Sequence, residues 1–188
     1  LPESHQEIAA VAEAAGQLGV QTPTVEAFTK TKAQLGETTN LTSEQAATDI
    51  AQIENVMRTA SDETDNLGAS LVALGNNGAS TEAQILAMAN RIAATGAQVG
   101  LTEADILGLA NAAASMGIEV EAGGSAVSRV FQTMAKDVAA GGDKLELFAQ
   151  VSGMTAQQFA KEFGDDPARA FAAFTQGLDR INKSGGDV

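Results

Sequence analysis

Apolar residues recur every three or four positions along most of the chain, which is the period of one face of an α-helix. The clearest stripe carries Val127, Val130, Phe131, Met134 and Val138. No run alternates between apolar and polar residues as a half-buried β-strand would. The pattern therefore predicts an all-α fold, a compact multi-helix domain of short helices. The other stripes at this period are Ala46, Ile50, Ile53 and Met57; Leu67, Leu71 and Leu74; Ile85, Ala89, Ile92, Gly96 and Val99; Ile106, Leu109, Ala113 and Met116; Phe159 and Phe163; and Phe171, Phe174, Leu178 and Ile181.

The predicted helices begin at residues that make good helix caps. In a capping box, a hydroxyl accepts a hydrogen bond from the backbone N–H three residues later, and the side chain at that position returns one. Leu101 and Ile106 flank one such box as a hydrophobic staple. The sequence predicts four boxes, at Thr42–Gln45, Thr81–Gln84, Thr102–Asp105 and Thr155–Gln158.

Glycines are expected to end the predicted helices, because glycine adopts the left-handed conformation common at helix C-caps. Helix starts at Thr81, at Thr102 and near Gly124 lie 21 and 22 residues apart. These intervals fit stacked helical hairpins joined by Gly-rich turns, and they also fit ordinary helices of similar length. The expected stops are Gly75 to Gly78, Gly100, Gly117, and Gly141 with Gly142.

Differences in patterning predict three regions. Residues 1–40 form an N-terminal helical segment, residues 41–152 a helical core, and residues 153–188 C-terminal helices that pack on the core. Six of the seven phenylalanines follow residue 130, so the best-packed region is expected in the C-terminal half. The first segment is predicted to hold one helix marked by Ile8, Val11, Ala15 and Leu18 and, after a break at Val20–Pro23, a second marked by Val25, Phe28, Lys32 and Leu35.

The charge balance excludes several classes of partner. The formal net charge of −13 repels polyphosphates and anionic bilayers, so no direct nucleic-acid binding is expected. Arg91 is the only basic residue between Thr59 and Gly124, which leaves that region without a basic patch.

No apolar stretch reaches the ~20 residues of a membrane span. The chain starts at Leu1 and ends just past a helical pattern, so we expect a segment of a longer protein or a processed product.

Residues that could carry chemistry are few. His5 is the only histidine and lies in a polar run, so we expect a solvated surface residue. A glycosidase needs paired carboxylates, usually with Trp or Tyr platforms for the sugar, and the chain has neither aromatic. The acids are better explained as residues that cap or precede helices. The acidic groups are Asp62, Glu63 and Asp65; Glu119 and Glu121; and Asp165 with Asp166, which precedes Pro167 at a helix entry.

Two other features imitate known ligand sites. Gly123-Gly124-Ser125 at a helix start resembles a phosphate cradle, but the preceding strand and the following lysine of a P-loop are missing. Helix capping and tight helix packing explain these glycines better. The run from Asp62 to Asp65 lacks the spacing and central glycine of a calcium loop, and the chain has no cysteine. We therefore predict no catalytic, cofactor-binding or metal site, and no enzyme activity.

An ordered series of short motifs resembles the core region of phage tail tape measure proteins of the TP901 family. The series covers roughly residues 35–178. Its quoted parts are LTSEQAA at 41–47, LGNNGASTEAQI at 74–85, ATGAQVGLTEADILGL at 94–109, SMGIEVEAGGSAVSR at 115–129, GMT at 153–155 with Phe159, and the helix from Phe171 to Gly177 and Leu178.

This resemblance implies a structural role in a virion tail. A tape measure chain is long and mostly helical, lies inside the tail tube during assembly, sets tail length, and leaves ahead of the DNA. The implied partners are tail tube and other tail proteins and tail assembly chaperones, with self-association left open. The protein would be made in the bacterial cytoplasm and assembled into the tail. The short, Gly-broken helices depart from the family's long coiled-coil rod, so the segment is expected to flank or interrupt that rod.

Two other functions are compatible with a helical chain. The first is a protein–protein interaction module of a cellular complex, which explains the helices but not the motif series. The second is a peptidoglycan hydrolase domain, because tape measure chains can carry such domains. Glu103 and Glu121 are the carboxylates on which that activity would be tested.

Overall fold

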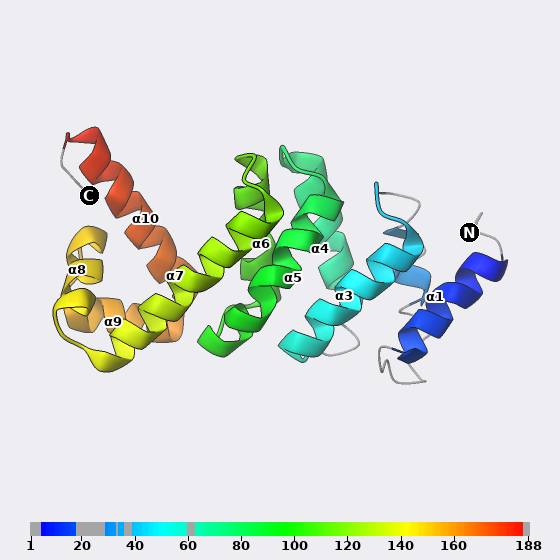
Figure 1. The fold of residues 1–188 in the computed structure, drawn as a ribbon, viewed down its shortest axis with the longest axis horizontal. Helices are drawn as coiled ribbons and strands as arrows, with labels where there is room; N and C mark the ends of the chain where they lie inside the picture. The colour runs from blue at the N-terminus through cyan, green and yellow to red at the C-terminus, as the bar shows by residue number, and fades with distance from the viewer. Residues whose placement is uncertain (1–4, 18–28, 33, 36–38, 60–62, 186–188) are drawn as a thin grey trace. The chain divides into compact units, whose positions relative to one another are not determined.

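The computed structural model describes residues 5–17, 29–32, 34–35, 39–59 and 63–185, with residues 5–8, 14 and 17 described by their backbone alone. Within these residues the regular structure is entirely helical, which confirms the all-α prediction. Residues 29–32 and 34–35 are helical as well. The helices are α1 (His5–Gln17), α3 (Ser43–Met57), α4 (Thr64–Asn77), α5 (Glu82–Val99), α6 (Glu103–Ser115), α7 (Val120–Ala140), α8 (Asp143–Ser152), α9 (Ala156–Asp165) and α10 (Pro167–Lys183) (Figure 1).

The chain divides into two compact units. Unit 1 comprises residues 1–94 and 102–125, and unit 2 comprises residues 95–101 and 126–188. The three-part division at residues 40 and 152 follows sequence landmarks instead and stays a prediction. No helix in the described part of the chain is both long and apolar enough to cross a membrane.

Unit 1 is built from helices that contact the next helix but one. Helix α1 packs against α3, and α4 packs against α6. Figure 1 shows α1, α3 and the first part of α5 side by side, with α4 and α6 in a second layer. This alternation is the arrangement of stacked helical hairpins, in which equivalent helices of successive pairs become neighbours.

The core of unit 1 is aliphatic. Ala46, Ile50 and Ile53 of α3 are buried, as the stripe on that helix predicts. The burial predicted from the stripe on α6 is partly wrong, because Met116 is 70% exposed at the end of the helix and Leu109 is half-buried. The residues of α6 that the fold buries instead are Ile106, Leu107, Ala110, Ala113 and Ala114.

The N-terminal stripes are only partly within the described residues. Val11 and Ala15 of α1 are buried against Ala47 and Ala51 of α3. Leu18, Val25 and Phe28, which were predicted to belong to these stripes, lie outside the described residues. Lys32 and Leu35 of the second stripe are buried.

The local signals that begin helices are confirmed. Thr102 caps α6: its Oγ1 accepts the Asp105 N–H at 3.2 Å, and the Asp105 carboxylate accepts the Thr102 N–H at 2.9 Å. The same reciprocal pairs form at Thr42–Gln45, Thr81–Gln84 and Thr155–Gln158. These contacts span three residues, so the sequence determines them without help from distant partners.

The predicted glycine stops divide into two groups. Gly100, Gly117, Gly141 and Gly142 have positive φ angles, as expected for left-handed positions. In the group at 75–78 the stop is confirmed, because α4 ends at its C-cap Gly78, but the left-handed conformation is wrong, because Gly78 is extended, with φ −97°, and Gly75 lies inside α4. A β-carbon on Gly78 would lie 2.5 Å from Asn111 Oδ1, so close packing against α6 is what requires a glycine here.

The start of α7 also differs from the prediction. The helix begins at Val120, so Gly123 and Gly124 lie within its first turns and do not precede it. The helices α5, α6 and α7 therefore do not start at a constant interval. A glycine pair resembles a helix boundary in the sequence, but here it occupies a helical position where another helix comes close.

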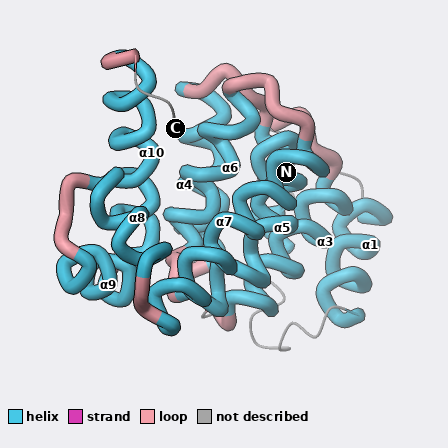
Figure 2. Tube along the Cα trace, turned by 60° about the vertical axis from the view of Figure 1, so that its left-hand side comes forward, coloured by secondary structure: helices cyan, strands magenta, loops and turns pink. Residues whose placement is uncertain are grey.

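The core of unit 2 is aromatic. Figure 2 shows α8, α9 and α10, and all three contact one another. Phe131 and Phe171 have ring centroids 5.0 Å apart, and Phe148 stacks on Phe159 at 5.9 Å and meets Phe174 edge-on at 5.3 Å. The predicted pair Phe159 and Phe163 is buried.

The stripe predicted on α10 is less deeply buried than expected. Phe171, Phe174, Leu178 and Ile181 are half-buried, and the buried positions of this helix are Pro167, Ala170 and Gly177. A β-carbon on Gly177 would collide with the backbone carbonyl of Val151 on α8. Small residues therefore let α10 approach α8 closely, and the larger side chains lie at the edges of this contact.

Candidate functional site

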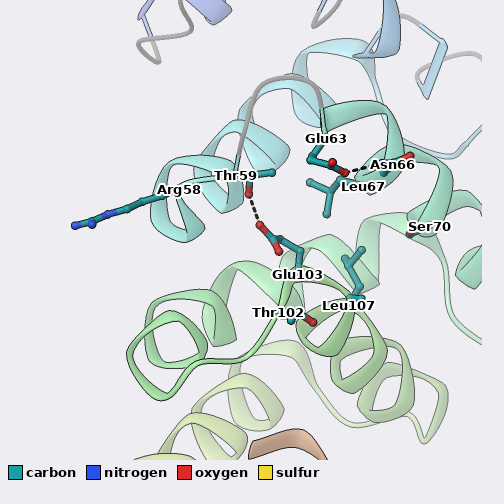
Figure 3. Close-up of a pocket in the computed structure, with 10 residues that line it drawn as sticks. Arg58, Thr59, Glu63, Asn66, Leu67, Ser70, Thr102, Glu103 and Leu107 are labelled. Carbon is teal, nitrogen blue, oxygen red and sulfur yellow. Dashed lines mark hydrogen bonds between the residues drawn. The ribbon is translucent and has the colours of Figure 1, made fainter. Parts of the chain in front are cut away.

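The described residues line a hollow of about 370 Å³ in unit 1, with both polar and apolar groups around it. It lies where α3 ends and where α4 and α6 begin (Figure 3). Leu67 and Leu107 supply apolar lining, and both are buried. The remaining lining residues are Arg58, Thr59, Glu63, Asn66, Ser70, Thr102, Glu103 and Ala104.

The polar side chains of the hollow bond to one another. Thr59 Oγ1 donates to Glu103 Oε1 at 2.5 Å, and Asn66 Nδ2 donates to Glu63 Oε2 at 2.6 Å (Figure 3). Arg58 extends away from the hollow in Figure 3, and its backbone is left-handed, with φ 59°, at the C-cap of α3. The described residues that point into the hollow therefore supply carboxylates and hydroxyls, while the Arg58 side chain extends away from it.

Helix electrostatics account for both carboxylates. Glu63 occupies the N-cap position of α4, and Glu103 is the first residue of α6. A negative charge at either place is favoured by the positive end of the helix dipole. Among the described residues that line the hollow there is no histidine, lysine or cysteine to work beside the two acids. One hydrogen bond joins the end of α3 to the start of α6, the other lies within the first turn of α4, and both carboxylates have a structural reason to be there.

The other acids singled out in the sequence are dispersed. Asp62 lies outside the described residues, Asp65 accepts a hydrogen bond from Thr31, and Glu119 is exposed ahead of α7. Glu121 forms an exposed ion pair with Arg91, with N–O distance 2.9 Å. Glu121 is not among the residues that line the hollow with Glu103, so the structure does not bring together the two carboxylates on which a hydrolase would be tested.

The acids before α10 serve helix structure, as expected. Asp166 Oδ1 accepts the backbone N–H of Arg169 at 2.9 Å and caps α10, with Pro167 in the first turn. Asp165 pairs with Lys161 one turn earlier on α9.

The backbone of His5 lies in α1, and its side chain is outside the described part of the structure. Among the described residues, no three His, Cys, Asp or Glu side chains are grouped as a metal would need.

The glycines that resemble a phosphate cradle lie against a neighbouring helix. A β-carbon on Gly123 would lie 2.7 Å from Met88 Cε, and one on Gly124 would lie 2.6 Å from Arg91 Cβ. Both neighbours belong to α5. The packing interpretation therefore accounts for these glycines, whereas capping does not, because both are inside α7.

Sequence reasoning missed a buried charge. Lys32 is 0% exposed, and its Nζ lies 3.7 Å from Glu54 Oε1 on α3. Burial lowers the pKa of Lys32 to about 8, and the attraction of Glu54 and Asp65 offsets only part of that effect. The signal was present in the sequence, because Lys32 occupies an apolar-stripe position between Phe28 and Leu35. A lysine at such a position more often buries its aliphatic stem and keeps its ammonium group in water, so the pattern alone did not indicate full burial.

Comparison with known proteins gives one match. The family described as phage-related minor tail protein matches residues 1–186. Neither the curated proteins nor the solved structures contain a match to this chain.

Proposed function

Because the chain belongs to the phage-related minor tail protein family, we propose that it is a non-enzymatic structural segment of a tail tape measure protein. In this role it takes part in tail assembly and in setting tail length. Its partners would be the tail tube, other tail proteins and tail assembly chaperones, and its place would be the virion tail.

The observation that carries the proposal is the extent of the family match, which spans residues 1–186. The ordered motif series supports the narrower assignment to tape measure proteins, because it runs through both units. The helix caps, the packed glycines and the ion pairs give structural reasons for the residues that first suggested chemistry. A structural role needs no further residues than these.

The packing of the helices limits how the segment could contribute to length. An extended helix rises ~1.5 Å per residue. In unit 2, α8, α9 and α10 pack on one another, so they span less than the same residues would in one rod. We infer that the segment is an assembly element beside the rod, with a small share in the measurement itself.

An in-frame deletion of residues 41–178 from the parent gene tests this role. The matched control removes an equal number of residues from a predicted rod of the same parent. Electron microscopy of the control phage should show tails shortened by ~1.5 Å per residue, or ~200 Å. Deletion of the segment should instead reduce the number of completed tails, and any tails formed should be shortened by much less.

Two results would contradict the proposal. Normal numbers of infectious phage with tails of unchanged length would exclude both an assembly and a measuring role. Shortening equal to that of the rod deletion would mean that the segment is extended in the tail and acts as ruler. Tail tube and tail chaperone genes beside the parent gene would separate the proposal from a cellular interaction module.

A further inference from the structure

The helical residues 29–32 and 34–35, here called the strap, are held on unit 1 by a buried ion pair. Thr29, Thr31, Lys32 and Leu35 are all buried, although three of these four side chains are polar or charged. The exposed residues between them are Lys30 and Gln34. The strap therefore buries an unusually polar face for a short helix.

The charged contact of the strap is with α3. Lys32 Nζ lies 3.7 Å from Glu54 Oε1, with the two side chains 0% and 13% exposed. Thr31 donates a hydrogen bond to Asp65 of α4, and Asp65 adds to the negative charge that faces Lys32. Removing one partner of a buried pair leaves the other charge uncompensated. The cost is larger for the ammonium left by loss of Glu54 than for the carboxylate left by loss of Lys32, because the Lys32 side chain is 0% exposed and the Glu54 side chain is 13% exposed.

The apolar contact of the strap is with α4. A β-carbon on Gly68 would lie 3.2 Å from Thr31 Cγ2 and 3.5 Å from Leu35 Cδ1, so the strap lies directly on the backbone of α4 there. Thr39 holds the far end, since its N–H and its Oγ1 both donate to the Leu35 carbonyl, at 3.0 and 2.6 Å. The strap thus meets α3 through the ion pair, and α4 through the Thr31–Asp65 hydrogen bond and a small packed contact.

We propose that the strap is a displaceable element of unit 1, latched by the Lys32–Glu54 ion pair, which opens without unfolding α3 and α4. Loss of the Glu54 charge releases the strap, because an ammonium group would then be buried with less compensation. Loss of the Lys32 charge leaves the strap closed. The two halves of the same ion pair therefore have opposite effects, which a purely additive contact would not produce.

Hydrogen exchange of the whole 188-residue chain, read by mass spectrometry at neutral pH, tests this proposal. In Glu54→Gln, amides of the strap should exchange at least about tenfold faster, while those of α3 and α4 keep their protection. In Lys32→Met, strap exchange should equal or fall below that of the parent chain. The double variant should behave like Lys32→Met. Lys30→Met is the matched control, because Lys30 is exposed on the same short helix, and it should change nothing.

Three results would overturn the latch. Equal acceleration in Glu54→Gln and Lys32→Met would show that the pair is an ordinary stabilising contact. Loss of protection throughout α3 and α4 together with the strap would show that the strap does not open separately. Unchanged strap exchange in Glu54→Gln would show that the ion pair holds nothing.

Discussion

The two units of this chain build a helical core from different side chains. Unit 1 uses aliphatic residues such as Ile50, Leu71 and Ile85, and it also buries a lysine. Unit 2 brings together six phenylalanines, with Phe131 and Phe159 fully buried. The best-packed region was expected in the C-terminal half, yet most of the largest fully buried side chains belong to unit 1.

This difference shows that aromatic content indicates which side chains build a core, and does not indicate how many large side chains are fully buried. A single phenylalanine side chain buries a large apolar area, so a few rings suffice to hold the helices of unit 2 together. Aliphatic and alanine side chains cover less area each, so the helices of unit 1 must come close and bury many of them. Close approach then places polar residues such as Lys32 inside the fold.

The largest expected effect comes from removing an aromatic ring of unit 2. Phe131→Ala should lower the free energy of unfolding by about 3–5 kcal/mol, because the side chain is 0% exposed and contacts Phe171. Denaturant unfolding would measure the loss, and hydrogen exchange would locate it. Protection should fall in α10 and persist in α3, and Leu71→Ala should give the reverse. If either variant weakens both helices equally, the units do not unfold separately and the contrast between them fails.

The next effect concerns the buried charge of unit 1. The pKa of Lys32 is lowered from 10.5 to about 8, so the unfolded chain binds more protons than the folded chain between these pH values. The contribution of Lys32 to stability therefore rises with pH through this window, by up to about 3 kcal/mol, and is most unfavourable below pH 8. The stability difference between the parent chain and Lys32→Met, measured at several pH values, isolates this group. Lys30→Met should show no such window, and a flat difference for Lys32→Met would mean that Lys32 titrates normally.

A smaller effect separates the glycines of the two units. Gly177→Ala should destabilise by about 1–3 kcal/mol, because the added carbon meets the backbone carbonyl of Val151. Gly75→Ala is the matched substitution in α4, where the added carbon meets the flexible side chain of Glu82. Since alanine favours a helix over glycine by ~1 kcal/mol, Gly75→Ala should be neutral or stabilising. Thermal unfolding of both variants measures the contrast, and equal effects would show that the contact between α8 and α10 adapts.

The sequence predicted the parts of the fold that depend on near neighbours. Every capping box lies within four residues, and the proline that follows Asp166 indicates a helix cap there. The buried faces of α3 and α9 follow from their stripes. The hollow was not predicted, because Thr59, Glu63 and Glu103 come from three helix ends that only folding brings together.

The relation to phage tail proteins and the helical character were thus available from residue order alone, because motifs, periodicity and caps are local properties of the chain. Only the tertiary structure decided that Gly78, Gly123 and Gly177 serve close helix packing, that Met116 is exposed, and that Lys32 is buried beside Glu54. In each of these cases the deciding partner lies far along the chain or in the surrounding solvent. The same glycine can end a helix or admit a neighbouring one, and the same lysine can be solvated or enclosed. The residues that pack around each position in the folded chain determine which of these alternatives is found.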